Sequence, residues 1–355
     1  MKVCMKHFRF SFLVTVICLG LAGWWGYTHG GISGALGAVG IAAILSVMEV
    51  SLSFDNAVVN ASVLKTWNSF WQNLFLGVGI IIAVFGMRLL FPLVIVAAAA
   101  DLNMAQVWTM ALNDPAQYST HLTNHHAEVA AFGGVFLLLV FLNFLFDDDK
   151  ELHWLGHVER KLSSFGRLAS MPVLLALAAV LGTVTMVAPE SRLAVLTAGV
   201  WGVLTYVAVD SLSSLLEKEE ASDVDVGKLV KQGGIGGFLY LEVLDASFSF
   251  DGVVGAFAIT NDVVVIMLGL AIGAMFVRSM TIYLVRQGTL DEFVYLEHGA
   301  HYAIGILALI MLASVKYHIP EIFTGLIGVA FIGASLWSSV AYRRKHAEQE
   351  DRIAA

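Results

Sequence analysis

Long apolar segments recur along almost the whole of this chain, and they constrain its fold more than any other feature. Of the 355 residues, 58% are hydrophobic and only 14% are charged, whereas an ordinary soluble domain carries about 25% charged residues. One globular core cannot bury that much apolar surface, so lipid must solvate most of it. The composition excludes a soluble enzyme and predicts an all-α protein that crosses a membrane several times.

About ten segments are apolar enough, and long enough, to cross the bilayer as helices. They run roughly over residues 10–27, 34–62, 72–98, 129–146, 170–188, 193–215, 234–259, 262–285, 300–316 and 321–342. Two interpretations of the first segment stay open: a signal peptide after Lys2, Lys6 and Arg9, or a retained helix. We favour the retained helix, because Trp24 and Trp25 form an aromatic belt at its far end and no clear cleavage site precedes them.

The basic residues indicate how such a ten-helix chain is oriented. With the N-terminus in the cytoplasm, most of the 20 Lys and Arg residues fall on the cytoplasmic side. Only Arg192 and Lys316 fall on the outer side, and Arg88 and Arg278 lie within apolar segments. This asymmetry predicts that both termini face the cytoplasm of a bacterial-type cytoplasmic membrane.

A motif repeats in the two halves of the chain. The stretch M-E-V-S-L-S-F-D-N at 48–56 recurs, with changes, as L-D-A-S-F-S-F-D-G at 244–252. Each copy is followed by a long apolar segment that carries one arginine, Arg88 or Arg278. The copies begin in the second and seventh segments, and this odd separation predicts an inverted-topology repeat of three helices, as in many secondary transporters. We also expect a break or strong tilt at each S-F-D step, because the two segments are long and polar in the middle.

Acidic residues in the middle of both motif segments are costly in a bilayer and need a partner or a purpose. Carboxylates, hydroxyls and an amide suit magnesium, calcium or manganese better than copper or zinc. The candidate metal ligands are Glu49, Ser53, Asp55, Asn56, Glu242, Asp245, Ser249 and Asp251. For Arg88 and Arg278 two roles stay open, neutralising the site or joining helices through ion pairs.

These motifs resemble those of the TerC family, within the LysE-like transporter superfamily. The resemblance rests on E-x-x-x-S-F-D-N at 49–56 and E-x-x-D-x-x-F-S-F-D at 242–251, each upstream of a membrane arginine. It extends through Phe132-Gly133-Gly134 and through Tyr295-Leu296 to Lys316, over somewhat more than half the chain. The resemblance implies export of a divalent metal, manganese above all, from the cytoplasm, and an association with tellurium resistance and with metal supply to exported proteins.

The chain departs from the family pattern in two respects. Gly252 stands opposite Asn56, where the family's second motif usually has a serine. An additional helix pair and an N-terminal helix indicate a divergent branch. The expected units are 1–33 as an N-terminal membrane helix, 34–146 as the first repeat, 147–232 as the inserted pair with its loops, 233–318 as the second repeat, and 319–355 as a C-terminal helix and tail.

We therefore predict a membrane transporter rather than an enzyme, with the divalent cation as substrate and no cofactor. Its expected partners are that ion and the lipid bilayer; no basic patch points to nucleic acid. Two rivals stay open: a metal-loading or scaffold membrane protein, and a membrane enzyme with paired carboxylates. In the outer loop, His121, His125, His126 and Glu128 are a weaker candidate for a metal site.

Overall fold

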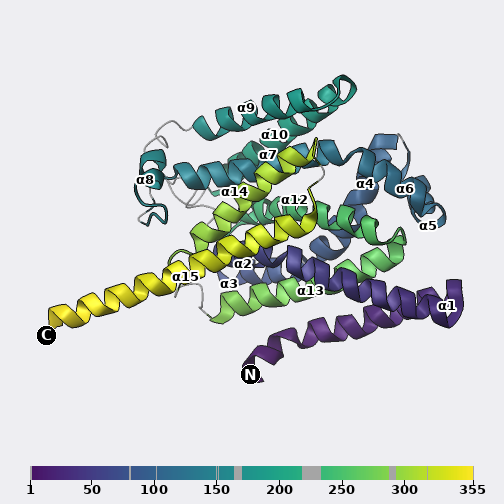
Figure 1. Cartoon of the computed structure of the whole chain (residues 1–355), viewed down its shortest axis with the longest axis horizontal. Helices are drawn as coiled ribbons and strands as arrows, with labels where there is room; N and C mark the ends of the chain where they lie inside the picture. Colours follow the sequence, from purple (N-terminus) through teal and green to yellow (C-terminus); the bar gives the residue numbers. More distant parts are fainter. Residues whose placement is uncertain are drawn as a thin grey trace.

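The computed structural model is helical throughout its described part (Figure 1). It describes residues 2–354 except Ile80, Asp101, Asp149, Glu151, 164–169, 218–232, 288–292 and His318. In that part, seven helical segments are long and apolar enough to cross a membrane. The all-α, membrane-spanning character predicted from composition is therefore confirmed.

The N-terminal element α1 (Lys2–Leu52) folds back on itself at Gly30 and Gly31. Gly31 has φ +59°, a left-handed conformation that glycine adopts without strain. The two arms touch where Gly26 meets Gly34, and the resulting hairpin lies along α13 (Val263–Gln287) at one side of the molecule (Figure 1). The first predicted segment and the start of the second thus form one helical hairpin.

The expected break at the S-F-D step occurs in the first motif copy and not in the second. Here α1 ends at Leu52, Ser53 forms a turn, and α2 (Phe54–Leu64) begins at once. In the second copy, α12 (Ile235–Ile259) continues as one helix through the whole motif. The first copy therefore presents its polar residues from two helices and the second from one.

The third predicted segment is not a regular α-helix. It contains α3 (Ser69–Leu74), two π-helical stretches, η1 (Phe75–Gly79) and η2 (Ile82–Leu90), and α4 (Phe91–Ala100). Such π-helical turns are rare and frequently occur at functional sites. Arg88 lies on η2.

A central helix, α7 (His126–Phe146), is buried over most of its length. It packs closely against α14 (Leu296–Ser314), where Gly134 lies against Leu312. The inserted pair, α9 (Met171–Met186) and α10 (Arg192–Glu217), covers α7 on one side, and the hairpin α1 with α13 occupies the other (Figure 1). The other elements are α5 (Met104–Asn113), α6 (Pro115–Asn124), α8 (His157–Ser163), the turn η4 (Pro189–Ser191) and α15 (Glu321–Ala354).

Candidate functional site

Glu49 and Arg88 form an ion pair inside the helix bundle. Glu49 lies in the last turn of α1, and Arg88 on η2 donates a hydrogen bond to its Oε1. The side chains are only 1% and 3% exposed. The Ser53 hydroxyl donates to the same oxygen at 2.8 Å, and Arg88 also donates to the Ala83 carbonyl at 2.6 Å. The pair thus satisfies two charges that would be costly alone in this setting.

A second polar contact joins the two motif copies directly. The Asn56 side chain on α2 donates a hydrogen bond to Asp245 on α12 at 2.5 Å. Asn60, one helical turn after Asn56, shares that helix face and approaches the same carboxylate. The first motif therefore reaches the second through an amide and a carboxylate, both buried.

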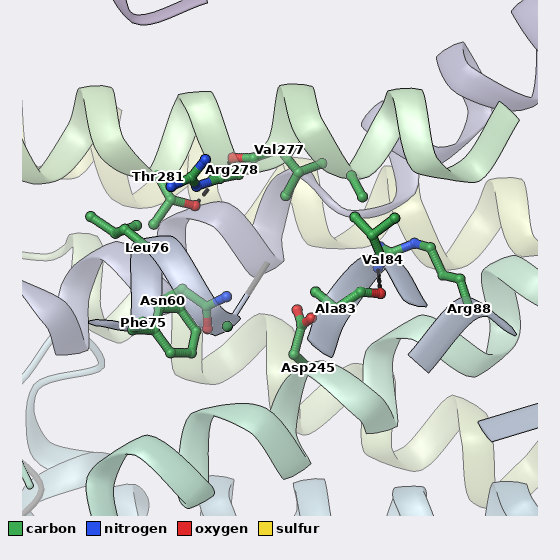
Figure 2. A pocket seen from close by; sticks show the side chains of 12 residues that line it. Asn60, Phe75, Leu76, Ala83, Val84, Arg88, Asp245, Val277, Arg278 and Thr281 are labelled. Carbon is green, nitrogen blue, oxygen red and sulfur yellow. Dashed lines mark hydrogen bonds between the residues drawn. The ribbon is translucent and has the colours of Figure 1, made fainter. Parts of the chain in front are cut away.

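A small cavity of about 50 Å³ lies beside this contact (Figure 2). Its wall carries Asn60, Asp245 and both membrane arginines, Arg88 and Arg278. They come from α2, α12, η2 and α13, so the cavity lies where the two motif-bearing halves meet. Among the described residues Arg278 has no ion-pair partner, and its buried Nε–H donates no hydrogen bond. Within the described residues, an ion pair that joins helices is therefore present for Arg88 and not for Arg278.

Besides the two carboxylate oxygens of Glu242, three neutral buried oxygen atoms around the motif have no hydrogen-bond partner within the described part of the chain. They are Asn56 Oδ1, Asn60 Oδ1 and Ser249 Oγ. Buried polar atoms are satisfied in the large majority of cases, so each exception needs an explanation. All three are neutral oxygen donors of the kind that hard cations bind.

Gly252, the departure from the family pattern, has a geometric explanation. A Cβ atom at this position would lie 2.9 Å from Glu49 Oε2. The Glu49 carboxylate therefore occupies the space that a side chain at 252 would need. The second copy has no side chain at this position, which leaves room for a carboxylate of the first copy.

The structure does not bring all predicted ligands together. Asp55 lies apart, with its carboxylate against Gly328 of α15 and a hydrogen bond from the Asn56 N–H. Glu242 approaches Gly79 of η1 instead of Glu49. The side chain of Asp251 lies outside the described residues. In the described part, no three His, Cys, Asp or Glu side chains form a group that could hold a metal ion.

The histidines at the junction of α6 and α7 also form no such group among the described residues. His125 is 3.3 Å from Glu128, and His126 contacts the Ser314 hydroxyl at 3.2 Å. The α5 and α6 helices occupy the segment that the sequence suggested was a polar loop. Sequence reasoning missed Asn60, although its spacing of four residues from Asn56 placed both on one helix face.

A comparison with curated proteins finds similarity to a protein that is named as a membrane protein. The "Uncharacterized membrane protein YceF" of Bacillus subtilis (strain 168) is 30% identical over 117 residues, which cover 32% of this chain and 44% of that protein. The chain thus spans less than half the length of this curated relative. No solved structure matches.

A family model gives the broader match. It covers residues 54–346, which include α2, the arginines of η2 and α13, and the whole second motif. Glu49 and the α1 hairpin precede the matched region. The resemblance to the TerC family stays a prediction from the motifs. Because the match extends over most of the chain, the protein belongs to the family described as "Protein of unknown function (DUF475)".

Proposed function

We propose that this protein is a transporter that exports a hard divalent cation, manganese by preference, across the cytoplasmic membrane. Its ion site would lie between the end of α1, α2 and α12, with Glu49 and Asp245 as the charged ligands. Ser53, Asn56 and Ser249 would add neutral oxygen atoms. The motif resemblance to the TerC family supports both the ion and the direction of transport.

The observation that carries the proposal is the meeting of the two motif copies. Glu49 and Asp245 occupy equivalent motif positions, and both are buried near Arg88. The unpartnered oxygens of Asn56 and Ser249 accompany them. Oxygen-only ligands with two carboxylates match the preference of Mn²⁺, Mg²⁺ and Ca²⁺.

Arg88 gives this site a mechanism for releasing its ion. In the structure its guanidinium neutralises Glu49. A divalent cation bound between Glu49 and Asp245 would balance both carboxylates, and Arg88 would then have to withdraw. The cation and Arg88 would therefore compete for Glu49, which keeps the buried charge balanced in either condition.

The packing of helices supports an inverted repeat within a chain of about ten spans. Suppose that α2, η2 and α7 of the first repeat correspond to α12, α13 and α14 of the second. Each helix that a first-repeat helix contacts in the second repeat should then have a counterpart contact in the opposite direction. This pattern is present, because α2 packs on α13 and α14, and α12 packs on η2 and α7. The corresponding elements also meet as η2 with α13 and as α7 with α14. A two-fold pseudo-axis between the halves accounts for this pattern and favours transport over catalysis.

Manganese flux in proteoliposomes tests the proposal. We expect Asp245→Asn and Glu49→Gln each to lower the initial rate by about tenfold or more, since each removes one charge from the ion. Asp262→Asn is the matched control, because Asp262 caps α13 and bonds Trp25 away from the site. It should keep the rate within about twofold. Unchanged flux in both site variants would refute the site.

A further inference from the structure

A second, larger cavity, here called the chamber, lies between η2, α7, α10 and α12. Its volume is about 380 Å³, within the range of small-molecule sites. The wall is almost entirely apolar, and several lining residues, such as Met87 and Val129, are half-buried at the outside of the bundle. The chamber is therefore accessible from the bilayer, and its lining residues differ from those of the small cavity beside Asp245.

One acidic side chain stands on the chamber wall. Glu242 is 5% exposed, and neither of its carboxylate oxygens has a hydrogen-bond partner among the described residues. A buried carboxylate in apolar surroundings is costly without a compensating charge. No ion pair to Glu242 occurs among the described residues, and the buried guanidinium of Arg88 is paired with Glu49. The chamber therefore offers a carboxyl group whose ionised form a bound cation would stabilise.

A hard metal ion does not fit the chamber. Besides Glu242, the oxygen donors of side chains on the wall are the hydroxyls of Thr205 and Ser247. The Ser247 hydroxyl already donates to the Val243 carbonyl of its own helix at 2.9 Å. Calcium and similar ions require about six oxygen ligands, far more than this wall supplies.

The apolar part of the wall favours a different kind of cation. Three phenylalanines, Phe91, Phe132 and Phe238, line the chamber together with aliphatic side chains. Aromatic faces attract quaternary and alkyl ammonium groups, which are poorly hydrated cations with an apolar body. We propose that the chamber binds a lipophilic ammonium compound, with its charge at Glu242 and its apolar body against the phenylalanines.

Such a group has two sources, a free lipophilic amine or the ammonium headgroup of a lipid. The test therefore uses benzyltriethylammonium as the probe and the full-length protein in dodecyl maltoside, a detergent without an ammonium group. Equilibrium dialysis of the radiolabelled probe measures its affinity. Lysophosphatidylethanolamine, added as a competitor, distinguishes the sources: displacement of the probe assigns the chamber to a lipid headgroup, and persistence of the probe assigns it to a free amine.

We expect the wild-type protein to bind the probe and Glu242→Gln to weaken binding by about tenfold or more, because a charge-assisted contact is lost. Phe132→Leu keeps the wall apolar but should weaken binding by about threefold. An uncharged analogue of the probe, in which carbon replaces the nitrogen atom, should bind equally well to the wild type, Glu242→Gln and Phe132→Leu. Absence of probe binding by the wild type, or equal affinity in Glu242→Gln, would overturn the proposal.

Ala246→Leu provides a second test that leaves the charge in place. Ala246 lies on the chamber wall, and the larger side chain would fill part of its volume. We expect it to weaken binding of both the probe and the uncharged analogue. Equal binding to this variant and the wild type would place the probe elsewhere. Because dialysis needs no ion flux, this outcome is independent of manganese transport.

Discussion

Arg88 is the residue on which the buried charge of the site depends. Its guanidinium contacts Glu49 and also the carbonyl of Ala83, so two hydrogen bonds fix its position. Removing one partner of a buried ion pair leaves the other charge uncompensated, which costs more than the pair itself contributes. The consequences of changing Arg88 should therefore be large and should depend on Glu49.

We predict that Arg88→Ala lowers the free energy of unfolding by about 3 to 5 kcal/mol. Adding Glu49→Gln to this variant should restore part of the loss, because the stranded charge is then removed. Unfolding in mixed detergent micelles, titrated with sodium dodecyl sulfate, measures both. Arg286→Ala, at an exposed position in the last turn of α13, is the control. If Arg88→Ala lowered the free energy of unfolding no more than Arg286→Ala does, the buried ion pair between Glu49 and Arg88 would be contradicted.

A second buried carboxyl, Glu159 on α8, lies outside the membrane-spanning helices. It accepts hydrogen bonds from Lys150 Nζ at 3.0 Å and from the Leu155 N–H at 3.1 Å, and His298 lies 3.3 Å away. Burial raises the pKa of this carboxyl, but the hydrogen bonds and the neighbouring charges outweigh burial and bring the pKa below its ordinary value. Glu159 thereby holds α8 and its loop against α14.

The lowered pKa of Glu159 determines how the stability of the protein should change with pH. The stabilisation from Glu159 should be fully present above its unfolded pKa of about 4.3 and should fade as the pH falls through the folded pKa. We predict that Glu159→Gln lowers the free energy of unfolding by about 1 to 3 kcal/mol at pH 7, with a smaller difference below pH 4. Unfolding curves from pH 3 to 7 measure it. Glu190→Gln, at an exposed position, is the control variant.

At the residue scale, the sequence predicted part of the site and could not predict the rest. The spacing of Glu49 and Ser53 put them on one helix face, and the structure joins them. The same reasoning could not place Asp55, because the turn at Ser53 directs α2 so that Asp55 faces α15. Whether an acidic residue faces a cavity or a neighbouring helix depends on packing between distant segments, which periodicity does not encode.

At the scale of elements, long apolar runs were the reliable signal. The predicted segments 129–146, 262–285 and 300–316 correspond closely to α7, α13 and α14. The π-helical form of η1 and η2 has no such signal, because hydropathy is the same whichever hydrogen-bond pattern the backbone adopts. The short helix α5 did have a local signal, the reciprocal cap between Asn103 and Gln106.

The α1 hairpin provides a prediction at this scale. Gly31 has φ +59° and Gly30 has φ −148°, and a Cβ atom at either position would meet nothing within 4 Å. Any cost of Gly31→Ala must then come from backbone strain alone, and with ψ −147° we expect about 1 to 3 kcal/mol. Gly30→Ala should change the free energy of unfolding by less than about 0.5 kcal/mol. Equal effects in the same detergent titration would argue against a turn at Gly31.

At the scale of the whole molecule, the charge asymmetry predicts the orientation. The basic residues near the C-terminus, Arg343, Arg344 and Lys345, follow the last apolar segment and should remain in the cytoplasm. Green fluorescent protein fused after Ala355 should therefore fluoresce, and alkaline phosphatase at the same position should be inactive. Alkaline phosphatase inserted between α5 and α6 should be active. An active phosphatase at the C-terminus would reverse the orientation.

The sequence separation of the polar contacts determines when each one can form during synthesis. Glu49 precedes Arg88 by 39 residues, so the ribosome delivers both within roughly 2 to 8 s, and the arginine can enter the bilayer beside a partner already made. Asn56 and Asp245 are 189 residues apart, so Asp245 is synthesised roughly 10 to 40 s after Asn56, and their hydrogen bond cannot form earlier. Assembly thus has an early and a late step: the first half enters the membrane with its arginine neutralised, and the site closes only after the second half has been synthesised.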